Sequence, residues 1–410
     1  MKTKVAVLFG GRSVEHEVSI ISGLQAFAAL DRSKYDPIPL YITKDNRFFT
    51  GEHMGDIESY RHNLKASLEA ATRVLLVPEN GEVKLVRYPA KKFGNNIVGS
   101  FEVAIPVVHG TNVEDGTLMG MLEMLGVPYA GCDVMSSALG MDKFYMKAAL
   151  QQAGLPVLPA HVFSGKEYAR DSRRVIEQAE ECGYPVIVKP VNLGSSVGIS
   201  KAADREALQT ALDTAFGFAP RVLVEKAVEH LREINCAVLG DADAAQASVC
   251  EEPIGSDEIL SFGDKYLRGG KGAKGSETSE GMSSLKRRCP ADIPDSLRDT
   301  VQQLAVKTFQ ALGCSGVSRI DFLNDRESGE LYINEINTIP GSMAFYLWQE
   351  SGVSYPQLID KLVEYAEKAF AEKNENNYAY TSDTLTFSYD TNILDGVSLG
   401  GAKGAKGGKA

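Results

Sequence analysis

The sequence has little of what marks membrane proteins, secreted proteins or zinc proteins. Its 410 residues include no apolar run of about 20, the length that a membrane-spanning helix needs. The six cysteines are scattered without a C-x-x-C pair, which disfavours a zinc site or a disulfide framework and favours reduced thiols. The N-terminus, MKTKVAVLFGG, lacks the apolar region of a signal peptide. We therefore expect a cytoplasmic protein without a membrane partner.

Basic residues are also in the minority. There are 43 Lys and Arg against 54 Asp and Glu, which gives a formal net charge of −11. This balance disfavours a nucleic-acid partner but leaves room for a local cationic pocket. Hydrophobic residues make up 44% of the chain, as in folded globular proteins. The length predicts about two to four domains.

The N-terminal part alternates strands and helices. Strands are expected at residues 4–9, 35–42 and 101–108. After the first strand and Gly10-Gly11, Ser13 is expected to cap a helix that continues to about Leu30. This order predicts an α/β domain with a doubly wound parallel sheet, which binds its ligand beyond the carboxyl ends of the strands. We expect the domain to cover residues 1–131.

The middle of the chain contains a loop of small residues between two strands. Residues 184–190 form an apolar strand that includes Lys189, and the loop Gly194-Ser195-Ser196-Val197-Gly198 follows before the strand resumes. The GxxxxGK[ST] string of a Walker P-loop is absent. The loop amides can form a nest for a phosphate, or the loop can be an ordinary hairpin turn. A further strand is expected at residues 221–226.

Four polar residues with a spacing of two predict a site near the C-terminus. Arg319 and Asp321 lie two apart in one expected strand (316–323), and Glu335 and Asn337 lie two apart in the next (331–337). Side chains two apart on a strand share a face, so paired strands would bring the four together. Carboxylate and amide oxygens suit magnesium, and an arginine can hold a phosphoryl group. The alternative is a surface ion pair on an exposed sheet face.

Several strings resemble the D-alanine–D-alanine ligase family of ATP-grasp ligases. They are GGRSVEHEVS (10–19), HGTNVEDGTLMGMLEMLGVPYAG (109–131), SSALGMDK (136–143), KPVNLGSSVGISK (189–201), CSGVSRIDF (314–322) and NEINTIPG (334–341). They occur in family order across residues 1–370. The resemblance implies that the first domain is followed by an α+β, two-domain ATP-grasp fold at 132–226 and 227–372. The polar tail, 373–410, is expected to be disordered.

The resemblance also implies a reaction. ATP phosphorylates the carboxylate of one D-alanine, and the amine of a second displaces the phosphate, which gives a dipeptide for peptidoglycan precursors. Two Mg²⁺ ions, or Mn²⁺, serve as cofactors, and relatives are commonly homodimers. Positioning and charge stabilisation dominate such catalysis.

Residue roles follow from the same resemblance. Catalytic roles are implied for Glu15, Ser195, Tyr266, Arg319 and Gly341. ATP contacts are implied for Lys143, Lys189, Ser195, Ser196, Glu225, Lys226, Glu233 and Lys265. Metal ligands are implied to be Asp321, Glu335 and Asn337, and His109 is implied to lie near the first D-alanine.

The acceptor end departs from the family pattern. Many relatives carry a serine–leucine pair after Pro-Gly that receives the acceptor's carboxylate, whereas this chain has SMAFYLWQESG after Gly341. Ser342 and Tyr346 are the candidate substitutes. The acceptor therefore stays open between D-alanine and D-serine or another amino acid, while Tyr266 disfavours D-lactate.

Two other classes of function are weighed against a ligase. One is a nucleotide-binding protein that has lost catalysis, which the intact set of four polar residues disfavours. The other is a nicotinamide dehydrogenase, which is disfavoured because Gly10-Gly11 does not belong to a G-x-G-x-x-G string.

Overall fold

The computed structural model describes residues 2–61, 63–194, 198–254 and 287–375. Residues up to Phe370 form one compact unit. Within the described ranges, no helix is long and apolar enough to cross a membrane.

The first sheet has seven strands in the order β6-β5-β4-β3-β2-β1-β7. The strands are β1 (Thr3–Gly10), β2 (Tyr35–Ile42), β3 (Phe48–Thr50), β4 (Thr72–Glu79), β5 (Glu82–Arg87), β6 (Ile97–Phe101) and β7 (Val103–Val108). The α/β class is confirmed, but parallel pairing is confined to β2-β1-β7. From β2 to β6 all pairs are antiparallel. Asn80-Gly81, both with positive φ, makes the tight turn between β4 and β5.

The helices of this part are α1 (His16–Ala29), α2 (Glu58–Arg61), α3 (Leu64–Ala70) and α4 (Thr117–Met124), with a short 3₁₀ helix η1 (Glu52–Gly55). The predicted Ser13 cap is wrong, since α1 begins at His16 with Glu15 at the N-cap position and no side-chain cap. The Ser13 hydroxyl instead donates to the His109 carbonyl at 2.5 Å and accepts from the Glu15 amide at 2.9 Å. It thus ties the loop after β1 to the end of β7, where a buried carbonyl needs a donor.

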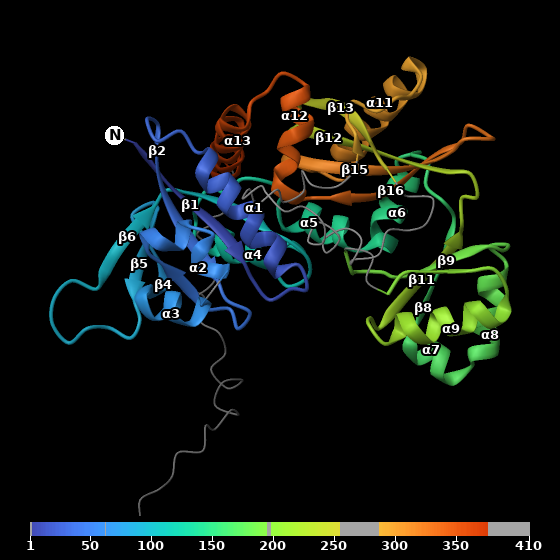
Figure 1. Cartoon of the computed structure of the whole chain (residues 1–410), viewed down its shortest axis with the longest axis horizontal. Coiled ribbons are helices and arrows are strands. Elements are labelled where there is room, and N and C mark those ends of the chain that lie inside the picture. The colour runs from blue at the N-terminus through green and yellow to red at the C-terminus, as the bar shows by residue number, and fades with distance from the viewer. Residues whose placement is uncertain (1, 62, 195–197, 255–286, 376–410) are drawn as a thin grey trace, which may run out of the picture. The chain divides into compact units, whose positions relative to one another are not determined.

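The second sheet has four antiparallel strands in the order β10-β9-β11-β8. They are β8 (Ala160–Ser164), β9 (Val186–Pro190), β10 (Ser200–Ala202) and β11 (Arg221–Lys226). Helices α7 (Gly165–Arg170), α8 (Ser172–Glu180) and α9 (Arg205–Phe216) lie beside this sheet (Figure 1). Buried residues of α8 and α9 pack on the sheet. The pairing of β9 with β10 confirms the predicted hairpin.

The third sheet has five antiparallel strands in the order β14-β13-β12-β15-β16. They are β12 (Leu231–Gly240), β13 (Ala245–Pro253), β14 (Arg287–Arg288), β15 (Gly316–Asp325) and β16 (Leu331–Asn337). The remaining elements are α5 (Val134–Met141), α6 (Lys143–Gln152), α11 (Asp295–Ala311), η4 (Gly341–Ala344), α12 (Phe345–Glu350) and α13 (Tyr355–Glu375). The predicted hairpin of 316–323 with 331–337 is confirmed as β15 and β16.

The hydrophobic cores cross the expected domain boundaries. Leu150 of α6 packs in one buried cluster with Ile320 of the five-stranded sheet, and Trp348 of α12 packs with Phe9 of β1 in another. The boundaries at 131, 226 and 372 therefore stay predictions. Residues 373–375 are helical, and the rest of the expected disordered tail lies outside the described residues.

Candidate active site

The strand register brings the four predicted polar residues together. Arg319 lies opposite Asn337, and Asp321 lies opposite Glu335, so all four point to one face of the sheet. Arg319 Nε and Nη2 donate to the two Asp321 carboxylate oxygens, each at 2.7 Å. Asn337 Nδ2 donates to Asp321 Oδ2 at 3.2 Å. The alternating pattern thus produces a compact polar platform rather than a scattered set.

The charges on this platform are balanced. Burial alone would lower the pKa of the Arg319 guanidinium, but the Asp321 carboxylate outweighs burial and raises that pKa well above its usual value. Glu335 Oε2 lies 3.4 Å from Lys143 Nζ. Among the residues that the structure describes, two cations thus accompany the two carboxylates.

The donor set fits magnesium by its chemistry. It consists of hard oxygen donors on one sheet face, with two carboxylates and one amide. In the described part of the chain, no three His, Cys, Asp or Glu side chains gather into a metal site, so an amide ligand such as Asn337 would have to contribute. Because the platform's own charges cancel, a divalent cation here requires further anionic ligands.

A cavity of about 890 Å³ adjoins the platform, a volume typical of pockets for small ligands and cofactors. Residues of β9, β11, β12, β15 and β16 line it. Its lining includes seven of the predicted ATP and metal residues: Lys143, Lys189, Glu225, Lys226, Glu233, Asp321 and Glu335. One cavity therefore joins the predicted nucleotide contacts to the predicted metal ligands.

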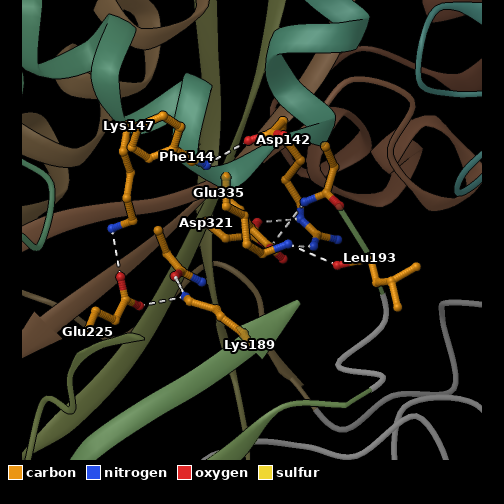
Figure 2. A network of polar contacts seen from close by, with 12 residues as sticks. Asp142, Phe144, Lys147, Lys189, Leu193, Glu225, Asp321 and Glu335 are labelled. Atoms are coloured by element: carbon orange, nitrogen blue, oxygen red, sulfur yellow. Dashed lines mark hydrogen bonds and ion pairs between the residues drawn. The ribbon is translucent and has the colours of Figure 1, made fainter. Parts of the chain in front are cut away.

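A buried carboxylate between two lysines forms one wall of the site. Figure 2 shows Lys147 and Lys189 reaching Glu225 from two sides, at 2.8 Å and 2.5 Å. All three are buried, with Glu225 only 1% exposed. Burial alone would raise the pKa of Glu225, but the two ammonium groups outweigh burial and lower it. Glu225 is thus an anion with two counter-ions.

Lys147 and Asn334 were missed by the sequence analysis. Lys147 also donates to the Leu158 carbonyl at 3.1 Å, and Lys189 donates to Asn334 Oδ1 at 3.1 Å. Lys143 and Lys147 have the i, i+4 spacing that places side chains on one helix face, and this was the available signal. The side chain of Lys143 donates to the Leu193 carbonyl at 2.9 Å, next to the small-residue loop.

Glu15, at the N-cap position of α1, lies against Gly110, the residue that follows His109. Glu15 is 8% exposed. A methyl carbon added to Gly110 would lie 2.8 Å from Glu15 Oε2, and one added to Gly194 would lie 3.1 Å from it, so both glycines approach this carboxylate closely. Glu15 thus lies against the residue that precedes Ser195. Burial lowers the pKa of His109 to about 4, so its imidazole is neutral at neutral pH. Its Nε2 lies 3.1 Å from Ser22 Oγ.

The segment after β16 is held by α1 and by the loop after β7. Ser342 is 1% exposed, and its hydroxyl donates to Gln25 Oε1 at 2.5 Å, so it points into α1. Glu114, which was also missed, accepts from the Ile339 amide at 3.1 Å and the Gly110 amide at 2.9 Å. Ser342, Met343 and Ala344 all have positive φ, an unusual run for residues that carry a side chain.

Tyr346 lies in a second polar cluster. Its hydroxyl donates to Glu251 Oε1 at 2.8 Å, and the Arg287 guanidinium lies 4.1 Å from the centre of its ring. Glu251 and Arg287 were not predicted from the sequence, since neither belongs to a recognisable motif. Four predicted site residues, Ser195, Ser196, Lys265 and Tyr266, lie outside the described residues.

Comparisons with known proteins cover nearly the whole chain. A family model described as D-ala D-ala ligase N-terminus matches residues 4–132, and one described as D-ala D-ala ligase C-terminus matches residues 149–364. The D-alanine–D-alanine ligase of Thermosipho africanus is 36% identical over 391 residues, which cover 95% of this chain and 98% of that protein.

Two solved structures are similar to this chain over most of its length. The D-alanine-D-alanine ligase from Coxiella burnetii has a TM-score of 0.75 and 28% identity, covering 91% of this chain and 96% of its own. The VanG D-Ala:D-Ser ligase from Enterococcus faecalis has a TM-score of 0.72 and 31% identity, and the match covers 89% of this chain and 100% of that chain. Similarity therefore extends over most of the length of both partners in each comparison.

Proposed function

Because this chain belongs to the D-alanine–D-alanine ligase family, we propose that it is an ATP-dependent ligase that joins two D-alanines. The donor's carboxylate oxygen attacks the γ-phosphorus of ATP, which releases ADP and leaves an acyl phosphate. The acceptor's amine then attacks the acyl carbon. A C–N bond forms, the C–O bond to phosphate breaks, and the amine's proton is lost to solvent.

The observation that supports this function best is the polar platform beside the cavity. Arg319, Asp321 and Glu335 gather on one sheet face, and Lys143 reaches the same place from α6. Asp321, Glu335 and Asn337 would hold Mg²⁺, two ions in this proposal, or Mn²⁺. When bound, the metal offsets the negative charge of the triphosphate.

The chain's own residues then orient the two amino acids. Glu15 would bind the donor's ammonium group, with Ser195 and Tyr266 completing a hydrogen-bonded set, and neutral His109 would lie near the donor. The Arg319 guanidinium and the Gly341 amide would stabilise the oxyanion of the tetrahedral intermediate. The hydroxyls of both candidates for the acceptor's carboxylate already donate within the protein, Ser342 to Gln25 and Tyr346 to Glu251.

The cellular setting is part of the same proposal. The dipeptide would enter peptidoglycan precursors for the cell wall, in the cytoplasm. We also propose a homodimer, which light scattering would test by a mass of two chains in solution. A mass of one chain would contradict it.

A D-alanine–D-serine ligase is the second candidate, and the similarity to the VanG enzyme favours it. The deciding experiment measures phosphate release and product identity with ATP, Mg²⁺ and a panel of D-amino acids. The first proposal expects D-alanyl-D-alanine from D-alanine alone. Preferential D-alanyl-D-serine from a mixture would support the second candidate. Absence of ADP formation with every amine would contradict both and favour a non-catalytic nucleotide-binding protein.

A further inference from the structure

The turn after β16 has an unusual backbone. Ser342, Met343 and Ala344 have φ of 50°, 55° and 49°, so three consecutive residues with side chains adopt the left-handed conformation. Residues other than glycine visit that conformation singly, because Cβ then crowds the following carbonyl oxygen. Such a run persists only where its surroundings hold it, and strained backbone of this kind is concentrated at functional sites. The contacts that hold this turn therefore bear on its function.

Two buried side chains from the N-terminal part of the chain hold the turn by its backbone. Glu114, in the loop after β7, accepts from the Ile339 amide at 3.1 Å. Ser22 of α1 accepts from the Ser342 amide at 3.0 Å. These two amides lie on either side of Gly341 in the chain, so the backbone at Gly341 is fixed from both directions. We call Glu114 and Ser22 the turn anchors.

His109 connects the two turn anchors. Its Nε2 lies 3.1 Å from Ser22 Oγ, and its ring also hydrogen-bonds to the backbone of Ile339. Thr338 adds a longer contact, from its hydroxyl to Glu114 Oε1 at 3.4 Å. The turn is thus held by a connected set of buried polar groups, and such networks make a conformation more rigid than separate bonds would.

The other oxygen of the Glu114 carboxyl group reaches the predicted site of the first D-alanine. Glu114 Oε2 accepts from the Gly110 amide at 2.9 Å. A methyl carbon on Gly110 would lie 2.8 Å from Glu15 Oε2, so Gly110 borders the carboxylate that is predicted to bind the ammonium group of the first D-alanine. Glu114 therefore joins that side of the site to the segment that carries the predicted oxyanion partner, Gly341.

Glu114 itself is unsuited to bind a cationic substrate group. Burial, and then the negative charge of Glu15, raises the pKa of Glu114 to about 8, so its carboxyl group is mostly protonated at neutral pH. Burying a carboxyl group is costly unless its hydrogen bonds are made, and an apolar residue would pack here at lower cost. What Glu114 supplies is a pair of acceptors for two backbone amides, Gly110 and Ile339.

We propose that Glu114 and Ser22 are positioning residues for the second step, because they hold the Gly341 amide where the oxyanion of the tetrahedral intermediate forms. The inference rests on the proposed function and adds to it the residues on which that amide depends. A hydrogen-bond donor stabilises an oxyanion only if it already points to the place where the charge develops, so a small displacement of the turn slows this step. Formation of the acyl phosphate develops no such oxyanion and should be affected less.

A labelled oxygen atom reports both steps in one reaction. ATP carries heavy oxygen in the bridge between its β- and γ-phosphorus atoms. When the acyl phosphate returns its phosphoryl group to bound ADP whose β-phosphate has rotated, the label appears in a non-bridging position of ATP. Attack by the amine instead gives dipeptide and phosphate. The ratio of label scrambling to dipeptide formation therefore measures how the acyl phosphate divides between return and attack, and it does not depend on the fraction of enzyme that is folded.

For Glu114→Gln we expect kcat to fall by about 10- to 100-fold, the effect of a misplaced catalytic group, and the ratio of scrambling to dipeptide to rise by a similar factor. Glutamine keeps one oxygen that can accept from an amide, but its nitrogen cannot accept from the other amide. The KM for ATP should change little, because Glu114 is not among the described residues that line the cavity. Ser22→Ala should also raise the ratio, because it releases the Ser342 amide.

Ser19→Ala is the matched control. Ser19 is also a buried serine of α1, and its hydroxyl accepts from the Gly10 amide at 2.8 Å and donates to the Val107 carbonyl at 2.6 Å. These bonds hold β1 and β7 but not the turn. Ser19→Ala should therefore lower Tm, as Ser22→Ala does, and leave the ratio of scrambling to dipeptide unchanged.

The outcomes separate this inference from the proposed function. An unchanged or lower ratio in Glu114→Gln would overturn the inference while the proposed function stands, because the turn would then not control attack on the acyl phosphate. An equal rise of the ratio in Ser19→Ala would overturn it as well, since any loosening of α1 would then suffice. A wild-type protein that forms neither ADP nor dipeptide with every D-amino acid tried would overturn the proposed function, and this inference with it.

Discussion

Lys147 is not among the described residues that line the cavity, yet its charge acts on one of the cavity's walls. Lys147, Lys189 and Glu225 together carry one net positive charge, and without Lys147 the remaining pair would be neutral. We expect Lys147→Met to raise the KM for ATP by about 10-fold or more, because Lys189 would then be fully compensated by Glu225. kcat at saturating ATP should fall less. Steady-state kinetics with varied ATP checks this.

Lys147→Arg is the control for that prediction. Arginine keeps the charge next to Glu225, so the KM for ATP should stay near the wild-type value. If the methionine and arginine variants lose ATP affinity equally, the effect is one of packing, and the electrostatic argument is wrong.

His109 gives a prediction about pH. Burial lowers its pKa to about 4 from 6.5, so below pH 6.5 the unfolded chain takes up a proton that the folded chain does not. The contribution of neutral His109 is therefore present above pH 6.5 and is lost as pH falls towards 4. Between pH 7 and pH 5 it amounts to about 2 kcal/mol. Between pH 7 and pH 5 the free energy of unfolding of His109→Gln, measured with urea, should therefore fall by about 2 kcal/mol less than that of wild type. Equal losses in variant and wild type would contradict the assignment.

At the scale of single residues, the spacing of polar residues predicted which side chains share a face of the β15–β16 pair. It predicted few other contacts of the site. Arg319, Asp321, Glu335 and Asn337 could be predicted because a period of two and a short turn determine their common face. Lys147 and Glu225 lie on different elements, 78 positions apart in the chain, and no local pattern reports such a pair. Glu251 was missed for the same reason, since its partners lie on β12, β14 and α12.

At the scale of elements, α5 packs closely against the end of β16. A methyl group on Gly140 of α5 would lie 2.7 Å from Thr338 Cγ2 and 3.2 Å from Ile336 Cγ2. Both neighbours flank Asn337, so Gly140→Ala should displace a predicted metal ligand. We expect a loss of about 1–3 kcal/mol in the free energy of unfolding, as for overpacked cores, together with a lower kcat. Thermal unfolding and phosphate release measure the two effects.

Gly120→Ala is the matched control, because Gly120 is also a helical glycine. Its added methyl group would meet only Val134 Cγ2, at 3.9 Å, which is ordinary contact. Stability should stay the same or rise by up to about 1 kcal/mol through helix propensity. If both variants behave alike, the contact of α5 with β16 does not constrain the site.

The elements that were predicted well are those with clear periodicity and clear ends. The hairpin of β15 and β16 falls within a few residues of the expected ranges. The antiparallel strands β3 to β6 were missed, because alternation of strands and helices was taken to extend through the whole first domain. Asn80-Gly81 was the available signal for a hairpin there. Ser13 was misassigned because its bond to His109 depends on a strand about 90 residues away.

At the scale of the whole molecule, the site depends on two sheets that share one cavity. Lys189 and Glu225 come from the four-stranded sheet, while Asp321 and Glu335 come from the five-stranded sheet. No single element contains both the predicted nucleotide contacts and the predicted metal ligands. A ligand that spans the cavity should therefore stabilise residues 1–370 as a unit, by an amount that grows with its concentration relative to Kd.

The charge balance predicts the order in which metal and nucleotide bind. Asp321 and Glu335 are already offset by Arg319 and Lys143, and the Lys147–Glu225–Lys189 group adds a positive charge nearby. Mg²⁺ alone should therefore bind weakly and leave Tm almost unchanged. A non-hydrolysable ATP analogue brings the missing negative charge, so with Mg²⁺ it should raise Tm by several degrees, in line with about 2–3 kcal/mol at 100 times Kd. The analogue without Mg²⁺ should give a smaller rise.

In Glu335→Gln, adding Mg²⁺ should no longer increase the analogue's effect, because one of the two carboxylates has been neutralised. A full rise in Tm with Mg²⁺ alone would show that the platform holds metal without the triphosphate, and the charge argument would then be wrong.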